Sequence, residues 1–132
     1  IRTIGDSYMA VAGVPVAEPD HARSIAKVAL RMRRYIERRN SAHPEQWRCR
    51  IGINTGSVIA GNVGAQARLN YTVHGDAVNL AARLEQLNKE FGTGTLVSAS
   101  TVALVSGENF EPKGEVDIRG KVEKVTVYSF TD

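Results

Sequence analysis

Two helical patterns separated by short strand patterns constrain the fold of this chain most. The first runs from about Asp20 to Arg39, where Pro19 and Asp20 give a helix start and apolar residues recur every three or four positions. The second follows a glycine turn at Gly75 and runs to about Lys89. The predicted core-facing residues are Ala22, Ile25, Ala26, Ala29, Met32 and Ile36 in the first helix, and Ala77, Leu80, Ala81, Leu84 and Leu87 in the second.

Short apolar runs around these helices predict strands. Two runs, at 1–4 and 8–12, flank the turn Gly5-Asp6-Ser7 and predict a hairpin. Further strands are predicted at 47–54, 58–63 and 95–98, with a loop up to Tyr71, a short helix at 100–105 and a closing hairpin at 116–119 and 122–130. This order predicts an α+β fold in which a layer of helices covers a mostly antiparallel sheet.

The composition limits the classes of function. The 132 residues fit one domain, and 17 basic against 14 acidic residues tolerate a phosphate ligand. No nucleic-acid partner is expected, because aromatic residues are sparse and are not interleaved with the basic ones. The single cysteine, Cys49, forms no internal disulfide, so we expect a reducing, cytoplasmic location. No run approaches ~20 apolar residues, so no membrane contact is expected from this segment, although a parent protein can be tethered elsewhere.

Asn79 and Arg83 form the most informative polar pair. At ~100° per residue they lie only ~40° apart on the second helix, and both project away from its apolar stripe. An arginine offers a planar, permanently charged fork for phosphate oxygens, and an asparagine can orient a ribose or a phosphate. The pair therefore suits a polyanion such as a nucleotide. A solvated helix surface is the alternative interpretation, since polar pairs at this spacing are common.

Four ordered motifs together resemble the class III nucleotide cyclase catalytic domain. They are IRTIGDSYM at residues 1–9, RIGINTG at 50–56, YTVHGDAVNLAARLE at 71–85 and VDIRGK at 116–121. The resemblance covers residues 1–132 and implies a ferredoxin-like α+β fold that works as a head-to-tail homodimer with shared active sites. It also implies conversion of a purine nucleoside triphosphate to a 3′,5′-cyclic monophosphate and pyrophosphate, with two Mg²⁺ (or Mn²⁺) ions in each complete site.

The resemblance assigns roles to seven residues. Asn79 and Arg83 are the expected catalytic residues, Asp6 is the expected metal ligand, and Arg2, Thr72, Arg50 and Arg119 are the expected substrate-binding residues. Asp6 and Arg50 are expected to serve one site. The residues expected to reach into the partner's site are Arg2, Thr72, Asn79, Arg83 and Arg119. Arg119 stands where the family often has lysine, which keeps the charge but changes its geometry.

The family's pattern also includes a second metal-binding aspartate on an upstream strand, which this chain does not contain. The chain starts without methionine and already inside a strand pattern. We therefore expect a piece of a longer polypeptide, a catalytic domain at 1–132 that is incomplete at the N-terminus and lacks its first strand and first helices. Such a piece is expected to be inactive alone.

Arg2 and Thr72 match the two positions that read the purine. Arginine only donates hydrogen bonds, so Arg2 suits the acceptor N1 of adenine, and the Thr72 hydroxyl can accept from the exocyclic amine. The sequence therefore predicts an adenylate cyclase acting on ATP. Two alternatives remain open: a cyclase with relaxed ATP/GTP selectivity, and a non-catalytic dimerisation or regulatory module with the same fold. A diguanylate cyclase is disfavoured, because Gly5 to Tyr8 lacks that family's signature.

Overall fold

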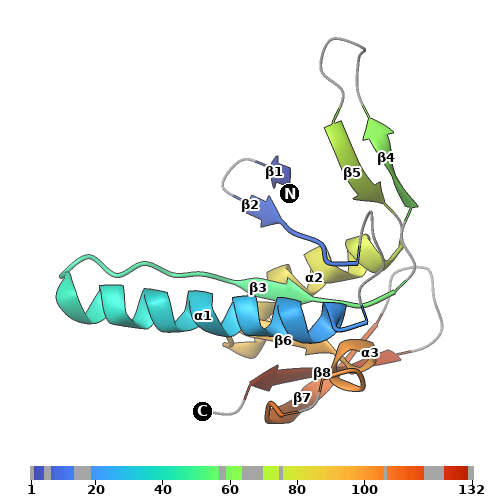
Figure 1. Ribbon diagram of the computed structural model, residues 1–132. Coiled ribbons are helices and arrows are strands. Elements are labelled where there is room, and N and C mark those ends of the chain that lie inside the picture. Colours follow the sequence, from blue (N-terminus) through green and yellow to red (C-terminus); the bar gives the residue numbers. More distant parts are fainter. Residues whose placement is uncertain are drawn as a thin grey trace.

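The computed structural model describes residues 2–4, 7–13, 19–56, 59–63, 70–74, 76–105, 107–117 and 124–130, with the backbone alone for 2–4, 7–8, 59–63 and 70–74. Figure 1 shows the elements in chain order. They are β1 (Arg2–Ile4), β2 (Ser7–Met9), α1 (His21–Ala42), β3 (Ile51–Ile53), β4 (Ile59–Val63), β5 (Asn70–His74), α2 (Asp76–Phe91), β6 (Thr95–Ser98), α3 (Ala99–Val102), β7 (Phe110–Asp117) and β8 (Lys124–Phe130).

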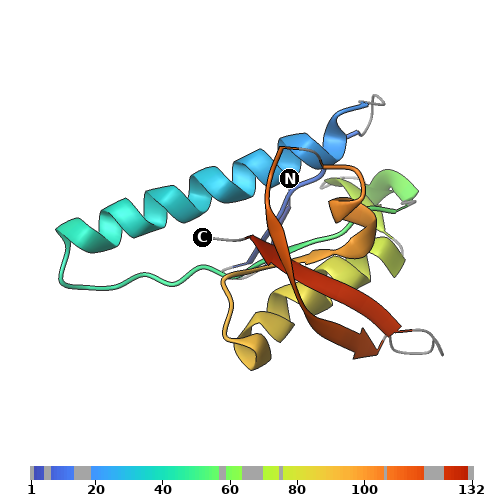
Figure 2. The same ribbon diagram turned by 90° about the horizontal axis from the view of Figure 1, so that it is seen from below.

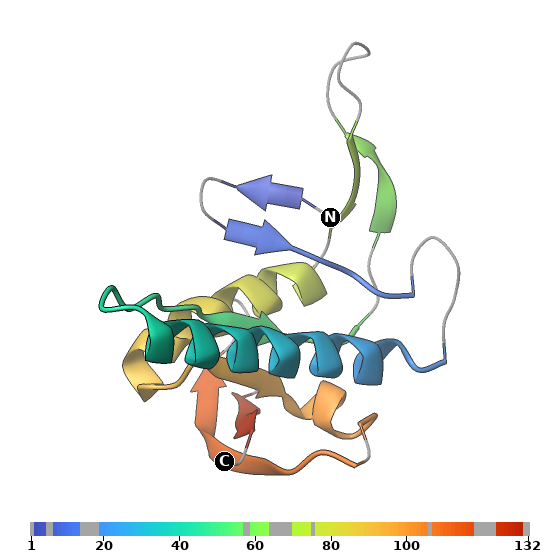
Figure 3. The ribbon, with the colours of Figure 1, turned by 60° about the vertical axis from the view of Figure 1, so that its left-hand side comes forward.

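A mixed four-stranded sheet forms the centre of the described structure. Its strand order is β3-β6-β8-β7, in which β3 and β6 are parallel and the other neighbours are antiparallel. Two antiparallel hairpins, β1-β2 and β4-β5, stand apart from this sheet. In Figures 1 and 3 both hairpins lie on the opposite side of α2 and β3 from β7 and β8, and β4-β5 extends outward. The predicted α+β class and the mostly antiparallel pairing are confirmed.

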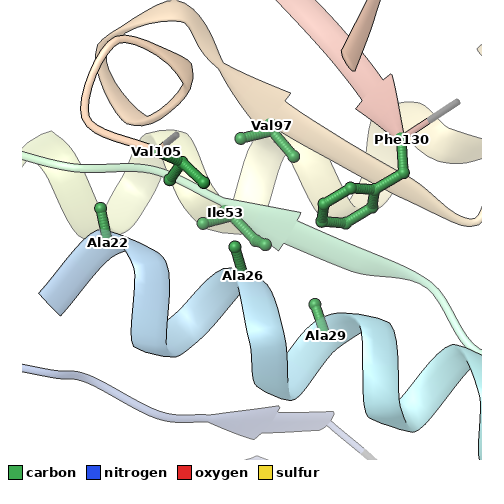
Figure 4. Packing of buried hydrophobic residues seen from close by; sticks show 7 residues of the cluster. All are labelled: Ala22, Ala26, Ala29, Ile53, Val97, Val105 and Phe130. Carbon is green, nitrogen blue, oxygen red and sulfur yellow. The ribbon is translucent and has the colours of Figure 1, made fainter. Parts of the chain in front are cut away.

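The two long helices lie on opposite faces of the sheet. Neighbouring residues of a strand point to opposite faces, so Val97 of β6 packs toward α1 and Leu96 packs toward α2. Figure 2 shows α1 and α2 on either side of β3 and β6. Figure 4 shows the small side chains of α1 directed at the sheet; this cluster contains Ala22, Ala26, Ala29, Ile53, Val97, Val105 and Phe130. The expected layer of helices is therefore divided between the two faces.

The contact between β3 and α2 is unusually close. A Cβ placed on Gly52 would lie 2.3 Å from the carbonyl oxygen of Ala81 and 2.4 Å from the amide nitrogen of Glu85. One hydrogen bond brackets this contact on each side. Asn54 Nδ2 donates to the Ala77 carbonyl at 2.9 Å, and the amide of Asn88, which is 1% exposed, donates to the Ile51 carbonyl at 2.9 Å. Glycine is therefore required where the helix backbone meets the strand.

Part of the sequence prediction was wrong around β3. The strand predicted at 47–54 contains only three strand residues, and the segment before it follows the end of α1 instead. The Arg39 guanidinium lies 3.7 Å from the ring centroid of Trp47, a cation–π contact. Asn40 both donates to the Trp47 carbonyl (2.8 Å) and accepts from its amide (2.9 Å), so these side chains hold the backbone that a neighbouring strand would otherwise pair.

Other differences have simple causes. Asn70–His74 was expected to be a loop up to Tyr71 but forms β5, because it pairs with β4 over five positions. Met32 was expected in the core and is 42% exposed, whereas Ala22, Ala26 and Ala29 are buried as predicted. The short helix ends at Val102 rather than 105, and β7 begins earlier than predicted, at Phe110.

The outer face of α1 carries several arginines that are exposed to solvent. Arg31, Arg34 and Arg38 are exposed, and the half-buried Arg33 pairs with Glu37 at 3.2 Å. Within the described part of the chain, no helix combines the length and the apolar character that crossing a bilayer requires.

The close contact at Gly52 gives a test of the fold. We expect Gly52→Ala to lower the free energy of unfolding by about 3 kcal/mol or more, because the added methyl group would overlap two backbone atoms of α2 that cannot rotate away. Chemical denaturation followed by circular dichroism measures this change.

Gly94→Ala is the matched control, since the nearest atom to its new Cβ would be the Cys49 carbonyl oxygen, at an ordinary 3.8 Å. We expect this variant to stay within about 1 kcal/mol of the parent chain. Equal stability of the two variants would contradict the proposed contact.

Candidate functional site

Asn79 and Arg83 lie on the exposed flank of α2. Both side chains are exposed, whereas Leu84 and Leu87 of the same helix are buried against the sheet. No hydrogen bond or ion pair joins the side chain of Asn79 or Arg83 to another residue that the structure describes. The prediction that this pair projects away from the core is therefore confirmed, and an amide and a guanidinium stay available to a ligand or another subunit.

The first turn of α2 is fixed by the end of β3. Asn54 uses both ends of its amide: Nδ2 donates to the Ala77 carbonyl, and Oδ1 accepts from the Ser100 hydroxyl at 3.2 Å. A Cβ on Gly56 would lie 2.9 Å from that of Ala77, so the chain after β3 also passes close to the helix start. Asp76 lies in the first turn, where a carboxylate interacts favourably with the helix dipole. These contacts determine where Asn79, half a turn further on, is held.

Arg50 lies beside the other flank of α2. Its Nη2 is 3.5 Å from Oε1 of Glu85, with 39% of the arginine side chain and 26% of the glutamate side chain exposed. Burial raises the pKa of the neighbouring Cys49 thiol; the negative charge of Glu85 raises it further, and Arg50 opposes this effect. The thiol is thus kept protonated, whereas the arginine keeps part of its guanidinium in solvent.

The two flanks are well separated around the helix axis. At ~100° per residue, Arg83 and Glu85 project ~160° apart, so α2 lies between Asn79 and Arg83 on one side and the Arg50 pair on the other. The structure therefore does not bring the predicted triphosphate contact together with the predicted catalytic pair inside one chain.

The remaining predicted site residues are placed only through the backbone or not at all. Arg2 pairs with Met9 in the β1-β2 hairpin, and Thr72 pairs with Gly61 in the β4-β5 hairpin. Both hairpins lie on the side of α2 and β3 that faces away from β7 and β8 (Figures 1 and 3). Asp6, between β1 and β2 in the sequence, and Arg119 lie outside the described residues.

Neither a metal-ligand cluster nor a cavity adds a site to these residues within the described part of the chain. In the described ranges, no three His, Cys, Asp or Glu side chains converge as metal ligands would. A cavity of about 350 Å³ lies between α1 and one end of the sheet and is lined by Cys49, Ile51, Thr95 and Phe130, among others. Asn79, Arg83 and Arg50 do not line it.

Sequence reasoning missed the residues that hold the site in place. Asn88 fills a buried position of the α2 stripe next to Leu87, where an apolar residue would be usual. That polar exception was a readable signal, because a buried amide needs partners. Asn88 Nδ2 donates to three backbone carbonyls, those of Ile51, Leu84 and Glu85. Glu85 carried no comparable signal, because its contact with Arg50 depends on how α2 lies across β3.

Comparisons with known proteins agree with these motifs. Residues 1–132 match the family described as the adenylate and guanylate cyclase catalytic domain. Adenylate cyclase 1 of Rhizobium meliloti is 40% identical over 134 residues, covering 97% of this chain and 20% of that protein. Guanylate cyclase soluble subunit beta-2 of Rattus norvegicus is 39% identical over 135 residues, covering 97% of this chain and 19% of that protein.

One solved structure extends the agreement to the fold. The catalytic core of a rhodopsin-guanylyl cyclase with converted specificity, in complex with ATPαS, superposes with a TM-score of 0.74 at 28% identity, covering 96% of this chain and 68% of that one. The chain spans about a fifth of the length of the two curated relatives. With the family match extending over residues 1–132, the chain belongs to the adenylate and guanylate cyclase catalytic domain family.

Proposed function

We propose that this domain is the catalytic part of an adenylate cyclase, which converts ATP to 3′,5′-cyclic AMP and pyrophosphate. The arrangement around α2 is the main support for this proposal. The side chains of Asn79 and Arg83 are exposed on one flank without partners among the described residues, and Arg50 lies beside the other flank. The family match makes cyclic-nucleotide chemistry the first hypothesis for these groups.

The chemistry requires the charges that these residues supply. The ribose 3′-hydroxyl attacks the α-phosphorus, and negative charge grows on the phosphate and on the departing pyrophosphate. Catalysis of this kind depends mainly on positioning and on charge stabilisation. In the proposed mechanism, Arg83 donates hydrogen bonds to the α-phosphate oxygens as their charge increases, Asn79 orients the ribose, and Arg50 and Arg119 hold the triphosphate.

The same arrangement supports a head-to-tail homodimer. One nucleotide cannot reach both flanks of α2 within one chain, because the helix lies between them. Two chains facing each other can place Arg50 of one beside Arg83 of the other. A two-fold axis then repeats this contact, so that each dimer has two such sites. In this proposal Arg50 and Asp6 belong to one subunit's half of a site, and Arg2, Thr72, Asn79, Arg83 and Arg119 to the other.

The choice of ATP rests on the base-reading positions. Arg2 donates to adenine N1 and the Thr72 hydroxyl accepts from the exocyclic amine, whereas guanine N1 would meet a second donor. GTP is the second candidate substrate, because the two curated relatives are named an adenylate cyclase and a guanylate cyclase subunit and are almost equally similar. The related catalytic core that was solved with ATPαS is a guanylyl cyclase with converted specificity, which supports the idea that this fold accommodates either base.

Divalent metal ions complete the proposal. Asp6 supplies a carboxylate, the hard oxygen ligand that Mg²⁺ prefers, and it is the candidate ligand for one of two ions. When bound, such ions neutralise phosphate charge and activate the attacking hydroxyl. We also propose a cytoplasmic location for the domain, where ATP and a reduced Cys49 are both expected.

Complementation between variants tests the shared site. We expect Arg50→Ala and Arg83→Ala each to lower kcat at least about 100-fold in the complete polypeptide. A purified heterodimer of the two variants keeps both arginines in one of its two sites, so it should recover about half of the parent activity. Cyclic AMP formed from MgATP, measured by chromatography, gives the result.

Arg31→Ala is the control, because it removes an exposed arginine from α1 rather than from the proposed site. An inactive heterodimer beside an active parent protein would refute the shared site. A folded, dimeric parent protein that turns over neither ATP nor GTP would instead indicate a non-catalytic dimerisation module.

Base selectivity is tested at Arg2. We expect kcat/KM for ATP to exceed that for GTP, and Arg2→Glu to shift the ratio toward GTP by about tenfold or more, since glutamate accepts from guanine N1 and no longer donates to adenine N1. Arg2→Lys, which remains a donor, should keep the ATP preference. An unchanged ratio in Arg2→Glu would remove Arg2 from base recognition.

Metal binding is tested at Asp6. We expect Asp6→Asn to lose nearly all activity and to weaken Mn²⁺ binding, measured by electron paramagnetic resonance, at unchanged thermal stability. Asp76→Asn is the control, because that carboxylate lies in the first turn of α2 and is not assigned to metal. Equal Mn²⁺ binding by the two variants would exclude Asp6 as a ligand.

A further inference from the structure

The Arg50–Glu85 pair has features that a stabilising ion pair does not need. Both side chains keep contact with water, with 39% and 26% exposed, so screening leaves the pair little to contribute to folding. The 3.5 Å between Nη2 and Oε1 is longer than a charge-assisted hydrogen bond, which falls at about 2.7–2.9 Å. The guanidinium is therefore directed by the carboxylate without being fully engaged by it.

The second carboxylate oxygen is the more informative atom. Oε2 of Glu85 is buried and has no hydrogen-bond partner within the described part of the chain. A buried acceptor without a donor is costly and requires an explanation. A guanidinium carries five N–H groups, and a small rotation of Arg50 would let two of them bind both oxygens of Glu85 in parallel. The remaining N–H groups would then point away from the carboxylate.

The backbones that carry this pair are fixed. Ile51, next to Arg50, donates its amide to the Gly94 carbonyl at 2.8 Å and accepts at its own carbonyl from Asn88. The amide nitrogen of Glu85 lies against Gly52, where no side chain fits. The field of the Glu85 carboxylate also raises the pKa of Cys49, more than Arg50 lowers it. The carboxylate is thus held at a defined point beside the arginine before any ligand arrives.

From these observations we propose that Glu85 is a positioning residue, which holds the Arg50 guanidinium in the orientation that contacts the triphosphate. The inference rests on the proposed function for the role of Arg50, and it adds a residue to which the sequence assigned no role. Glu85 does not touch the nucleotide in this proposal. It acts through Arg50 by limiting the orientations of a long side chain, which a bound phosphate would otherwise have to do.

A double-mutant cycle tests the proposal in the complete polypeptide. The probe is magnesium pyrophosphate, whose dissociation constant is measured by calorimetry for the parent protein, Glu85→Ala, Arg50→Ala and the double variant. We expect Glu85→Ala to weaken binding about tenfold in the parent protein and not at all in the Arg50→Ala background, because two residues that act through one contact are not additive. The KM for ATP should rise in parallel.

Glu37→Ala is the matched control, since it removes a carboxylate from an arginine pair on α1, the 3.2 Å pair with Arg33. It should leave pyrophosphate binding unchanged. Glu85→Gln keeps an acceptor but loses the charge, so it should weaken pyrophosphate binding less than Glu85→Ala does. It takes the place of Glu85→Ala in the cycle if Glu85→Ala unfolds at a lower temperature than the parent protein. Equal weakening by the Glu85 variant with and without Arg50, or no weakening at all, would overturn the proposal.

The two proposals fail in different ways. A parent protein that binds magnesium pyrophosphate with the expected coupling but forms no cyclic nucleotide would sink the proposed function and support the positioning role. A protein that forms cyclic nucleotide but shows no coupling between Glu85 and Arg50 would support the proposed function and overturn the positioning role. A parent protein that does not bind the probe would overturn the positioning role.

Discussion

The close approach of α2 to β3 at Gly52 is the constraint on which the rest of the structure depends. Two backbones meet where a methyl group would lie 2.3 Å from a carbonyl oxygen, and an asparagine amide closes the contact on each side. Packing of this kind determines the helix's position and rotation together, because neither backbone can move without losing one of these hydrogen bonds. The side chains on both flanks of α2 are oriented by this one contact.

That orientation connects the core to the chemistry. The buried side of α2 supplies Leu84, Leu87 and Asn88, one flank presents the exposed Asn79 and Arg83, and the other reaches Arg50 through Glu85. A helix 16 residues long thus separates two sets of polar groups that a nucleotide polyphosphate would need at once. In the proposed head-to-tail dimer, a second chain would supply the missing set of groups without any change in the packing of either chain.

The sequence predicted what depends on local periodicity. The spacing of Ala22, Ala26 and Ala29 gave the buried face of α1, and the motif at 76–85 gave an exposed polar pair on α2. It failed where distant side chains replace backbone pairing: Trp47 reads as a strand residue but binds Asn40 at the end of α1. It also could not give the Arg50–Glu85 contact, since the crossing of α2 over β3 is a property of the folded chain. The roles of Arg2, Thr72, Asp6 and Arg119 stay predictions from the motifs.

The exposure of Asn79 and Arg83 affects how these two positions can change during evolution of the family. Neither side chain fills space in the core or satisfies a partner among the described residues, so their replacement leaves folding almost unaffected. Selection for a foldable sequence therefore does not preserve them. Under the proposed function, a gene copy that is no longer selected for catalysis can lose both side chains and still encode the same fold.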